Sequence, residues 1–289
     1  ALLNIINFQT LIATKASRIV SAAKGEPLLE FGTRRAQELD AALWGTRAAY
    51  IGGFNATSNV RAGKLFNLPV SGTHAHALVQ AYKNDYDAFT AYAKTHHNVV
   101  FLVDTFDTLK SGVPNAIKVA REFGDKINFQ GVRIDSGDMV GLSQTIRQEL
   151  DKAGFPNAKI YASNDLDEYA ITNLKKQNAK IDVWGVGTKL ITAFDQPALG
   201  AVYKMVSISG NNTIKLSDDD EKISTPGKKQ IWRTDTGDML TLFDEQGVGR
   251  PILQDIFVHG KQIYQIPTAQ AVQRYAKDSL SAIPAPFKR

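Results

Sequence analysis

VVFLVD (99–104), INFQGVRID (127–135), KIYASND (159–165) and DVWGVGT (182–188) are four short, almost wholly apolar stretches that follow one another along the chain. The segments between them have helical spacing and end on Gly as a C-terminal cap does, for example LSQTIRQELDKAG (142–154). Apolar strands that alternate with helices indicate a parallel sheet covered on both faces. The pattern therefore predicts an α/β fold.

Each of the four stretches ends in a polar cluster, such as Ser163-Asn164-Asp165 after the third. In a closed α/β barrel the loops that follow the strands meet at one face, whereas in an open doubly wound sheet they line a crevice. LLEFGTRR (28–35) and LPVSGTHAH (68–76) are two earlier strand-to-loop junctions. Successive polar strand ends favour the barrel, so we predict an α/β barrel with one shared pocket over residues 1–200.

The pattern changes after residue 200. AVYKMVSIS (201–209) alternates apolar and polar residues, and QIWRTDTGDMLTLFDE (230–245) is typical of an antiparallel hairpin. We therefore predict a mainly β segment over residues 201–289, in which the acidic run at 218–221 forms a solvated turn.

The 289 residues are 43% hydrophobic and 22% charged, the composition of an ordinary globular protein. No apolar run approaches the roughly 18 to 20 residues of a membrane span, so we expect no membrane partner. The net charge of +5 is spread without a basic run, which argues against a nucleic-acid partner and fits a local pocket for small anions. Cysteine is absent, which excludes disulfides and thiolate metal sites and fits a cytoplasmic location.

Basic residues accompany two of the predicted strands. Arg34 and Arg35 follow the stretch at 28–30, and Arg133 lies just before a strand end. The planar guanidinium group suits bidentate recognition of phosphate or carboxylate, although pairing with surface acids is the alternative. Gly185-Val186-Gly187-Thr188 offers backbone N–H groups to an oxyanion. Together these loops predict a phosphate cradle.

Two of the five histidines, His74 and His76, lie between small residues after the apolar stretch at 68–70. Imidazole acts as a base, a nucleophile or a metal ligand. Residues i and i+2 of a strand point in opposite directions, so the two rings do not share a metal ion without a bend. The same alternation sends Arg133 and Asp135 to one side, where Arg could hold an anion and Asp could accept from sugar hydroxyls.

Seven blocks of the sequence resemble, in order and spacing, the nicotinate phosphoribosyltransferase family of type II phosphoribosyltransferases. They are LEFGTRRAQ (29–37), TSNVRAGK (57–64), PVSGTHAHA (69–77), FLVDTFDTLKSG (101–112), GVRIDSGD (131–138), ASNDLDE (162–168) and VWGVGTKL (183–190). The resemblance implies an irregular, TIM-like α/β barrel with a second domain. It also implies a reaction of nicotinate with phosphoribosyl pyrophosphate, coupled through a phosphohistidine to ATP hydrolysis and assisted by Mg²⁺, in a homodimer.

The resemblance also implies roles for individual residues, none of them a metal ligand. His76, rather than His74, matches the phosphorylated histidine, and Arg133 and Asp135 match residues that hold substrate and ribose. The residues expected to bind substrate are Phe31, Arg34, Ser58, Thr73, Asn164, Asp165, Gly185, Gly187 and Thr188. Relatives begin well before Ala1, which agrees with a chain that starts inside a helical pattern, so we expect a fragment that lacks the N-terminal region.

The acceptor specificity follows from the loop Asn55–Asn59. Enzymes of this superfamily that use nicotinamide place an acid in this loop, and here the loop is neutral with Arg61 close behind. A neutral loop suits the carboxylate of nicotinate. The alternatives are a nicotinamide or quinolinate phosphoribosyltransferase, or a barrel that binds a phosphosugar without catalysis.

Overall fold

The computed structural model describes residues 1–283 and divides the chain into two compact units. The larger unit comprises Leu2–Leu199 and the chain from Thr268 onward, and the smaller unit comprises Gly200–Pro267 together with Ala1. No described helix is both long and apolar enough to cross a membrane.

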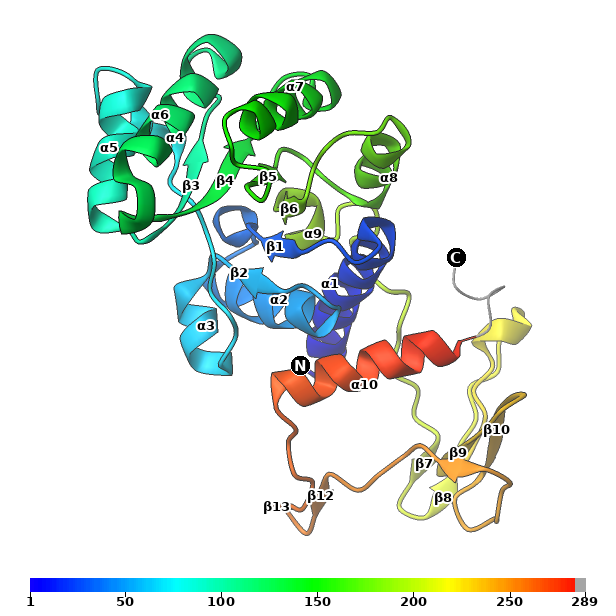
Figure 1. Cartoon of the computed structure of the whole chain (residues 1–289). Helices are drawn as coiled ribbons and strands as arrows, with labels where there is room; N and C mark the ends of the chain where they lie inside the picture. The colour runs from blue at the N-terminus through cyan, green and yellow to red at the C-terminus, as the bar shows by residue number, and fades with distance from the viewer. Residues whose placement is uncertain (284–289) are drawn as a thin grey trace. The chain divides into compact units, whose positions relative to one another are not determined.

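The larger unit is built on one sheet of six parallel strands in the order β2-β1-β6-β5-β4-β3 (Figure 1). The strands are β1 (Leu28–Glu30), β2 (Ala56–Thr57), β3 (Asn98–Leu102), β4 (Asn128–Ile134), β5 (Lys159–Ala162) and β6 (Val183–Val186). Among the described residues β2 and β3 do not pair with each other. The predicted α/β barrel with an additional mainly β segment is confirmed, in the form of a half-barrel rather than a closed ring.

The half-barrel stays open because the segment expected as a strand at 68–76 contributes a single bridge, between Val70 and Thr57. Beyond that bridge a side chain takes the place of a strand, since Nε2 of His74 accepts a hydrogen bond from the backbone N–H of Leu102 in β3 at 3.1 Å. Between the edge strands β2 and β3, the His74 side chain therefore makes one hydrogen bond to β3 where a closed barrel has a ladder of backbone hydrogen bonds.

Alternation along the strands separates two faces of the sheet. Residues of the outer face, such as Ile134 and Trp184, are buried in the main core with the helices. The inner face carries a second, smaller cluster of Leu29, Ala56 and Val183, against which Phe31 and Tyr161 pack. Side chains at the strand ends that point to the inner face can therefore lie close together.

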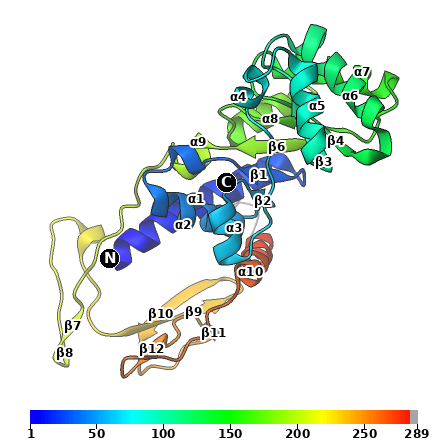
Figure 2. The ribbon, with the colours of Figure 1, turned by 90° about the vertical axis from the view of Figure 1, so that its left-hand side faces the viewer.

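Ten helices belong to the described part of the larger unit. They are α1 (Leu2–Ala23), α2 (Leu39–Ile51), α3 (Val60–Phe66), α4 (His76–Gln80), α5 (Asp85–Thr95), α6 (Val113–Phe123), α7 (Met139–Lys152), α8 (Glu168–Lys176), α9 (Thr188–Ile191) and α10 (Ala269–Ala282). Asp138 and Asp167 cap α7 and α8 by accepting from Val140 N–H at 3.1 Å and Ala170 N–H at 2.8 Å. Figure 2 shows α1 and α2 running side by side, and the two helices pack together.

A buried ammonium group ties α1 to the rest of this unit. Lys15 Nζ lies 2.8 Å from Glu168 Oε2 and 2.9 Å from Asp195 Oδ1. Burial by itself lowers the pKa of Lys15, but the hydrogen bonds and charges of the two carboxylates outweigh it, so the pKa is raised. The amine therefore stays charged, and the loss of Lys15 would leave two carboxylates without their shared cation.

The smaller unit contains a three-stranded antiparallel sheet in the order β10-β9-β11 and two short hairpins. Its strands are β7 (Ser207–Ile208), β8 (Asn211–Asn212), β9 (Lys229–Thr234), β10 (Gly237–Leu242), β11 (Arg250–Pro251), β12 (Phe257–Val258) and β13 (Lys261–Gln262). The hairpin of β9 and β10 lies where the sequence predicts it. The last helix differs from the expectation of a mainly β segment to residue 289, because α10 packs on α2 and so belongs to the larger unit.

Candidate active site

A single cavity of about 420 Å³ at the carboxyl ends of the parallel strands contains all twelve residues that the sequence singles out. It is lined by Phe31, Arg34, Arg35, Ser58, Gly72, Thr73, His74, Ala75, His76, Arg133, Asp135, Ser163, Asn164, Asp165, Gly185, Gly187 and Thr188. These residues come from six separate strand ends and loops. They lie together because parallel strands place their carboxyl ends at one edge of the sheet, as expected.

Arg133 is a buried cation in the wall of this cavity. Its Nη2 donates to the His74 carbonyl at 3.1 Å and its Nη1 to Ser163 Oγ at 3.4 Å. Its Nε is buried and has no hydrogen-bond partner in the part of the chain that the structure describes. Burial lowers the pKa of Arg133, and Asp135 and Asp104 oppose that effect. A buried guanidinium with an unused donor is suited to an anionic ligand.

An aromatic ring lies against this cation. The guanidinium carbon of Arg133 is 5.9 Å from the centre of the Phe31 ring. A Cβ added to Gly185 would lie 2.6 Å from Cε2 of Phe31, so only glycine in β6 leaves room for the ring. The inner face therefore offers an aromatic surface beside a positive charge, which fits a planar aromatic anion.

His76 lies at the start of α4 between a hydroxyl group and two carboxylates. Its Nδ1 is 3.0 Å from Thr105 Oγ1, and its Nε2 is 3.5 Å from Asp135 Oδ2 and 3.8 Å from Asp104 Oδ1. The ring remains 37% exposed at the cavity edge. The hydroxyl group and the carboxylates orient the imidazole ring, so His76 has the surroundings of a reactive histidine.

Asp104 is a site residue that the sequence prediction left out. Its side chain is 2% exposed, and Oδ2 accepts from Asp135 N–H at 2.8 Å and Ser136 Oγ at 2.6 Å. Its other oxygen, Oδ1, is buried without a hydrogen-bond partner among residues 1–283. The polar ending of VVFLVD (99–104) was the available signal for it. The cavity lining includes Arg35 and Ser163, which belong to loops that the sequence already indicated.

The expected phosphate cradle consists of the loops after β5 and β6. Asn164 and Asp165 have φ angles of 106° and 45°, in the left-handed region that Asn and Asp tolerate best. Lys189 Nζ lies 2.8 Å from Asp167 Oδ2 and so joins the two loops. Arg35, in the turn after β1, donates to Thr188 Oγ1 at 2.7 Å and so joins that turn to the loop after β6. Backbone N–H groups of these loops and the side chains of Arg34 and Arg35 thus lie at one end of the cavity.

His74 differs from His76 in its surroundings. It is 7% exposed and lies among Phe89, Tyr92 and Phe101, with its ring centre 4.9 Å from that of Tyr92. Because Nε2 accepts from a backbone N–H, the neutral ring carries its proton on Nδ1. Burial lowers the pKa of His74 to about 4. His74 is therefore a neutral, structural residue at neutral pH.

We expect this buried ring to make folding stability depend on pH. The folded-state pKa of about 4 lies below the ordinary value of 6.5, so the unfolded chain takes up the proton first as the pH falls. The stabilisation is complete above pH 6.5 and is lost progressively toward pH 4, by about 3 kcal/mol in all. Urea unfolding across this window should show a steeper loss for the wild type than for His74→Gln, whose amide keeps an acceptor for Leu102. Parallel pH profiles would contradict this assignment.

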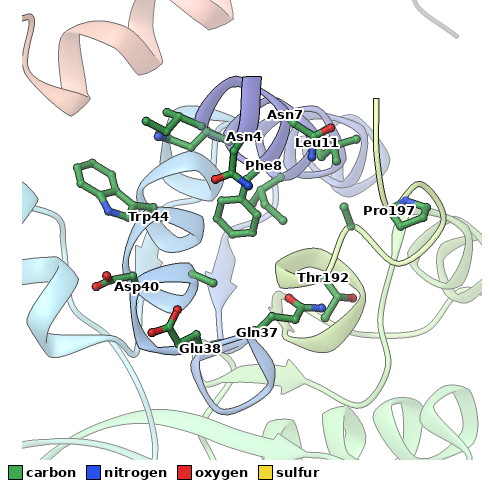
Figure 3. A pocket seen from close by; sticks show the side chains of 15 residues that line it. Asn4, Asn7, Phe8, Leu11, Gln37, Glu38, Asp40, Trp44, Thr192 and Pro197 are labelled. Atoms are coloured by element: carbon green, nitrogen blue, oxygen red, sulfur yellow. The ribbon is translucent and has the colours of Figure 1, made fainter. Parts of the chain in front are cut away.

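The structure contains a second, larger cavity of about 620 Å³ with different chemistry (Figure 3). Phe8, Leu11 and Trp44 give it an apolar wall, and its charged lining residues are the acids Glu38 and Asp40. None of the twelve predicted residues lines it. The residues predicted to bind anions therefore line the cavity of about 420 Å³ and not this one.

A parallel half-barrel with a cationic cavity at its carboxyl ends defines an α/β protein of the class that binds small anions at strand ends. A sequence model described as the nicotinate phosphoribosyltransferase (NAPRTase) family matches residues 27–245. The chain belongs to the nicotinate phosphoribosyltransferase family.

Individual relatives agree with this assignment. The chain is 55% identical to a nicotinate phosphoribosyltransferase of Bacillus subtilis (strain 168) over 323 residues, covering 100% of this chain and 66% of the relative. It is 39% identical to nicotinate phosphoribosyltransferase pncB2 of Mycobacterium tuberculosis (strain H37Rv), covering 98% and 62%. The crystal structure of human nicotinic acid phosphoribosyltransferase superposes with a TM-score of 0.86 at 26% identity, covering 100% of this chain and 71% of that one. The chain thus spans slightly less than two thirds of the length of these curated relatives.

Proposed function

We propose that this protein transfers the phosphoribosyl group of phosphoribosyl pyrophosphate to nicotinate, releasing pyrophosphate and forming nicotinate mononucleotide. The observation that carries the proposal is the buried Arg133 guanidinium, with an unused Nε donor, beside the Phe31 ring in the cavity of the phosphate loops. An aromatic carboxylate fits the cation and the ring together. The names and the similarity of the relatives support the same reaction.

The reaction displaces pyrophosphate from C1 of the ribose through a transition state with oxocarbenium character. Little acid–base chemistry is needed, so positioning and charge stabilisation dominate catalysis. In our proposal Phe31 and Arg133 hold the nicotinate ring and carboxylate, and Asp135 accepts from ribose hydroxyls. The loops around Asn164 and Gly187 bind the 5′-phosphate, which fixes C1 in line with the pyridine nitrogen.

We further propose that ATP phosphorylates His76 and that Mg²⁺ accompanies the phosphate substrates. No group of three or more His, Cys, Asp or Glu side chains in residues 1–283 is arranged to hold a metal ion by itself. Mg²⁺ commonly uses one or two carboxylates and completes its coordination with substrate phosphates and water. Asp135 and the unpartnered Oδ1 of Asp104 fit that requirement. Bound there, Mg²⁺ would neutralise the charge of the leaving pyrophosphate.

The first test is product formation by the full-length protein. Incubation with nicotinate, phosphoribosyl pyrophosphate and Mg-ATP should yield nicotinate mononucleotide and acid-labile protein phosphate. A phosphosugar-binding barrel without catalysis would bind phosphoribosyl pyrophosphate but form no product, and a quinolinate enzyme would release carbon dioxide from quinolinate. The homodimer and the cytoplasmic location expected from the sequence stay predictions.

The choice of nicotinate over nicotinamide gives a further prediction. Ser58 is exposed at the cavity wall, and its hydroxyl donates to the Glu30 carbonyl at 3.3 Å. An acid here would oppose the carboxylate of nicotinate, so Ser58→Asp should lower kcat/KM for nicotinate about a hundredfold and change that for nicotinamide far less. Ser71→Asp is the matched control, because Ser71 does not line this cavity. Equal losses for both substrates would contradict the role of this loop.

A further inference from the structure

Glu30 is a buried carboxylic acid at the end of β1, directly beneath the cavity. It is 1% exposed, and no described basic side chain forms an ion pair with it. Oε2 accepts from Thr46 Oγ1 at 2.9 Å and from Thr57 Oγ1 at 2.6 Å, and Oε1 accepts from the Gly32 N–H. Burial raises the pKa of Glu30, and these three hydrogen bonds oppose the rise. A buried carboxyl group without a cation beside it is costly unless its oxygens accept hydrogen bonds, so these three donors stabilise Glu30 in its buried position.

The donors belong to three different segments of the chain. Gly32 begins the turn that carries Phe31 and Arg34 into the cavity, and Thr57 precedes Ser58 in the loop after β2. The backbone of Glu30 acts on the same loop, because its carbonyl accepts from Ser58 N–H at 3.0 Å. Thr46, in contrast, lies in α2 and lines neither wall of the cavity.

We propose that Glu30 is a positioning residue that sets the distance between the two cavity walls, Phe31 on one side and Ser58 on the other. One carboxyl group is hydrogen-bonded to the turn after β1 and to Thr57, the last residue of β2 and the neighbour of Ser58, so neither wall moves without stretching a buried hydrogen bond. The inference rests on the proposed function, in which the pyridine carboxylate binds between these walls. The competing view is a structural role alone, in which Glu30 only holds α2 against the sheet.

Substitutions of Thr46 and Thr57 distinguish the positioning role from the structural role. Both side chains donate to the same oxygen of Glu30, and they are 1% and 2% exposed. Thr57→Val removes the hydrogen-bond donor at the end of β2, directly before Ser58. Thr46→Val removes the hydrogen-bond donor on α2. We expect Thr57→Val to raise KM for nicotinate about tenfold with kcat nearly unchanged, since uniform binding is lost. Thr46→Val should leave KM within about twofold of the wild type, and Thr57→Ser should restore it.

A double-mutant cycle tests whether Thr57 acts through Glu30, because Thr57 Oγ1 also accepts from Asn59 N–H at 2.9 Å. Glu30→Gln and Thr57→Val should each raise KM, and the double variant should be little worse than the more severe single one. If Glu30→Gln fails to fold, the KM values of Thr57→Val and Thr57→Ser decide whether the inference holds. Equal KM shifts in Thr46→Val and Thr57→Val, or none in either, would overturn the inference.

Hydrogen–deuterium exchange keeps this test separate from the proposed function. The Ser58 amide, which donates to Glu30, should exchange faster in Thr57→Val and at the wild-type rate in Thr46→Val. An inactive wild type would end the proposed function, and the exchange rates alone would then support or overturn the coupling of the loops through Glu30. An active wild type with unchanged Ser58 exchange in Thr57→Val would overturn only the inference.

Discussion

Replacing Arg133 by Met is expected to lower kcat/KM for phosphoribosyl transfer by about a thousandfold. The guanidinium is buried, lies over the Phe31 ring and keeps an Nε without a hydrogen-bond partner among residues 1–283, so the bound anion would lose a buried cation. A charge-assisted contact in such a site is worth several kcal/mol, of the order of 2 to 5. Methionine keeps the length and apolar packing of the arginine stem, which limits the loss of stability.

Steady-state kinetics of Arg133→Met should be compared with those of Arg121→Met. Arg121 donates to the Ala153 carbonyl at 2.8 Å on the exposed surface and does not line the cavity. The control should therefore retain wild-type turnover. An Arg133→Met protein that keeps more than about a tenth of wild-type kcat/KM would remove this residue from the proposed anion site.

Replacing His76 by Ala is expected to abolish ATP-dependent protein phosphorylation and the stimulation of transfer by ATP. The ring is exposed at the cavity edge, with Thr105 and Asp135 on its two nitrogen atoms. A phosphate on it would add close to two negative charges and three acceptor oxygens, which would help to hold Mg²⁺ with the pyrophosphate group and so couple ATP cleavage to substrate binding. Transfer without ATP should persist at a reduced rate, because Arg133 and the phosphate loops remain.

The companion variant His74→Gln should retain phosphorylation and ATP coupling, because His74 is buried and neutral. Labelled ATP and acid-labile phosphate measure the first property, and ATP titration of the transfer rate measures the second. Retention of both in His76→Ala, or their loss in His74→Gln, would reassign the phosphorylated residue.

Much of the site was predictable because it depends on short-range alternation. Arg133 and Asp135 are two residues apart on β4, so they share the inner face whatever the remainder of the sheet does. The polar ends of apolar strands likewise indicated which loops meet, since parallel strands place all their carboxyl ends at one edge. The hairpin of β9 and β10 was predictable for the same local reason.

Other features depend on contacts between residues far apart in the sequence. Neither the approach of Asp104 to His76 nor the three donors of Glu30 follows from spacing, because each contact requires the final register of several strands. The helix α10 lies within the segment expected to be mainly β, and only its packing on α2 shows that it belongs with the larger unit. The open edge of the half-barrel was likewise not predictable, because the segment at 68–76 contacts β3 through one hydrogen bond of the His74 side chain instead of pairing with it as a strand.

The amino-acid sequence by itself determined the class of fold, the family and the set of loops that form the cavity, because these depend on local periodicity and on motifs. The resemblance already selects His76 over His74, but only the tertiary structure shows how the surroundings of the two rings differ. His74 and His76 lie two residues apart in nearly identical surroundings along the chain. Aromatic side chains from α5 and β3 bury His74 and keep it neutral, whereas His76 faces the cavity and two carboxylates, and burial and charge at this point come from residues distant in sequence.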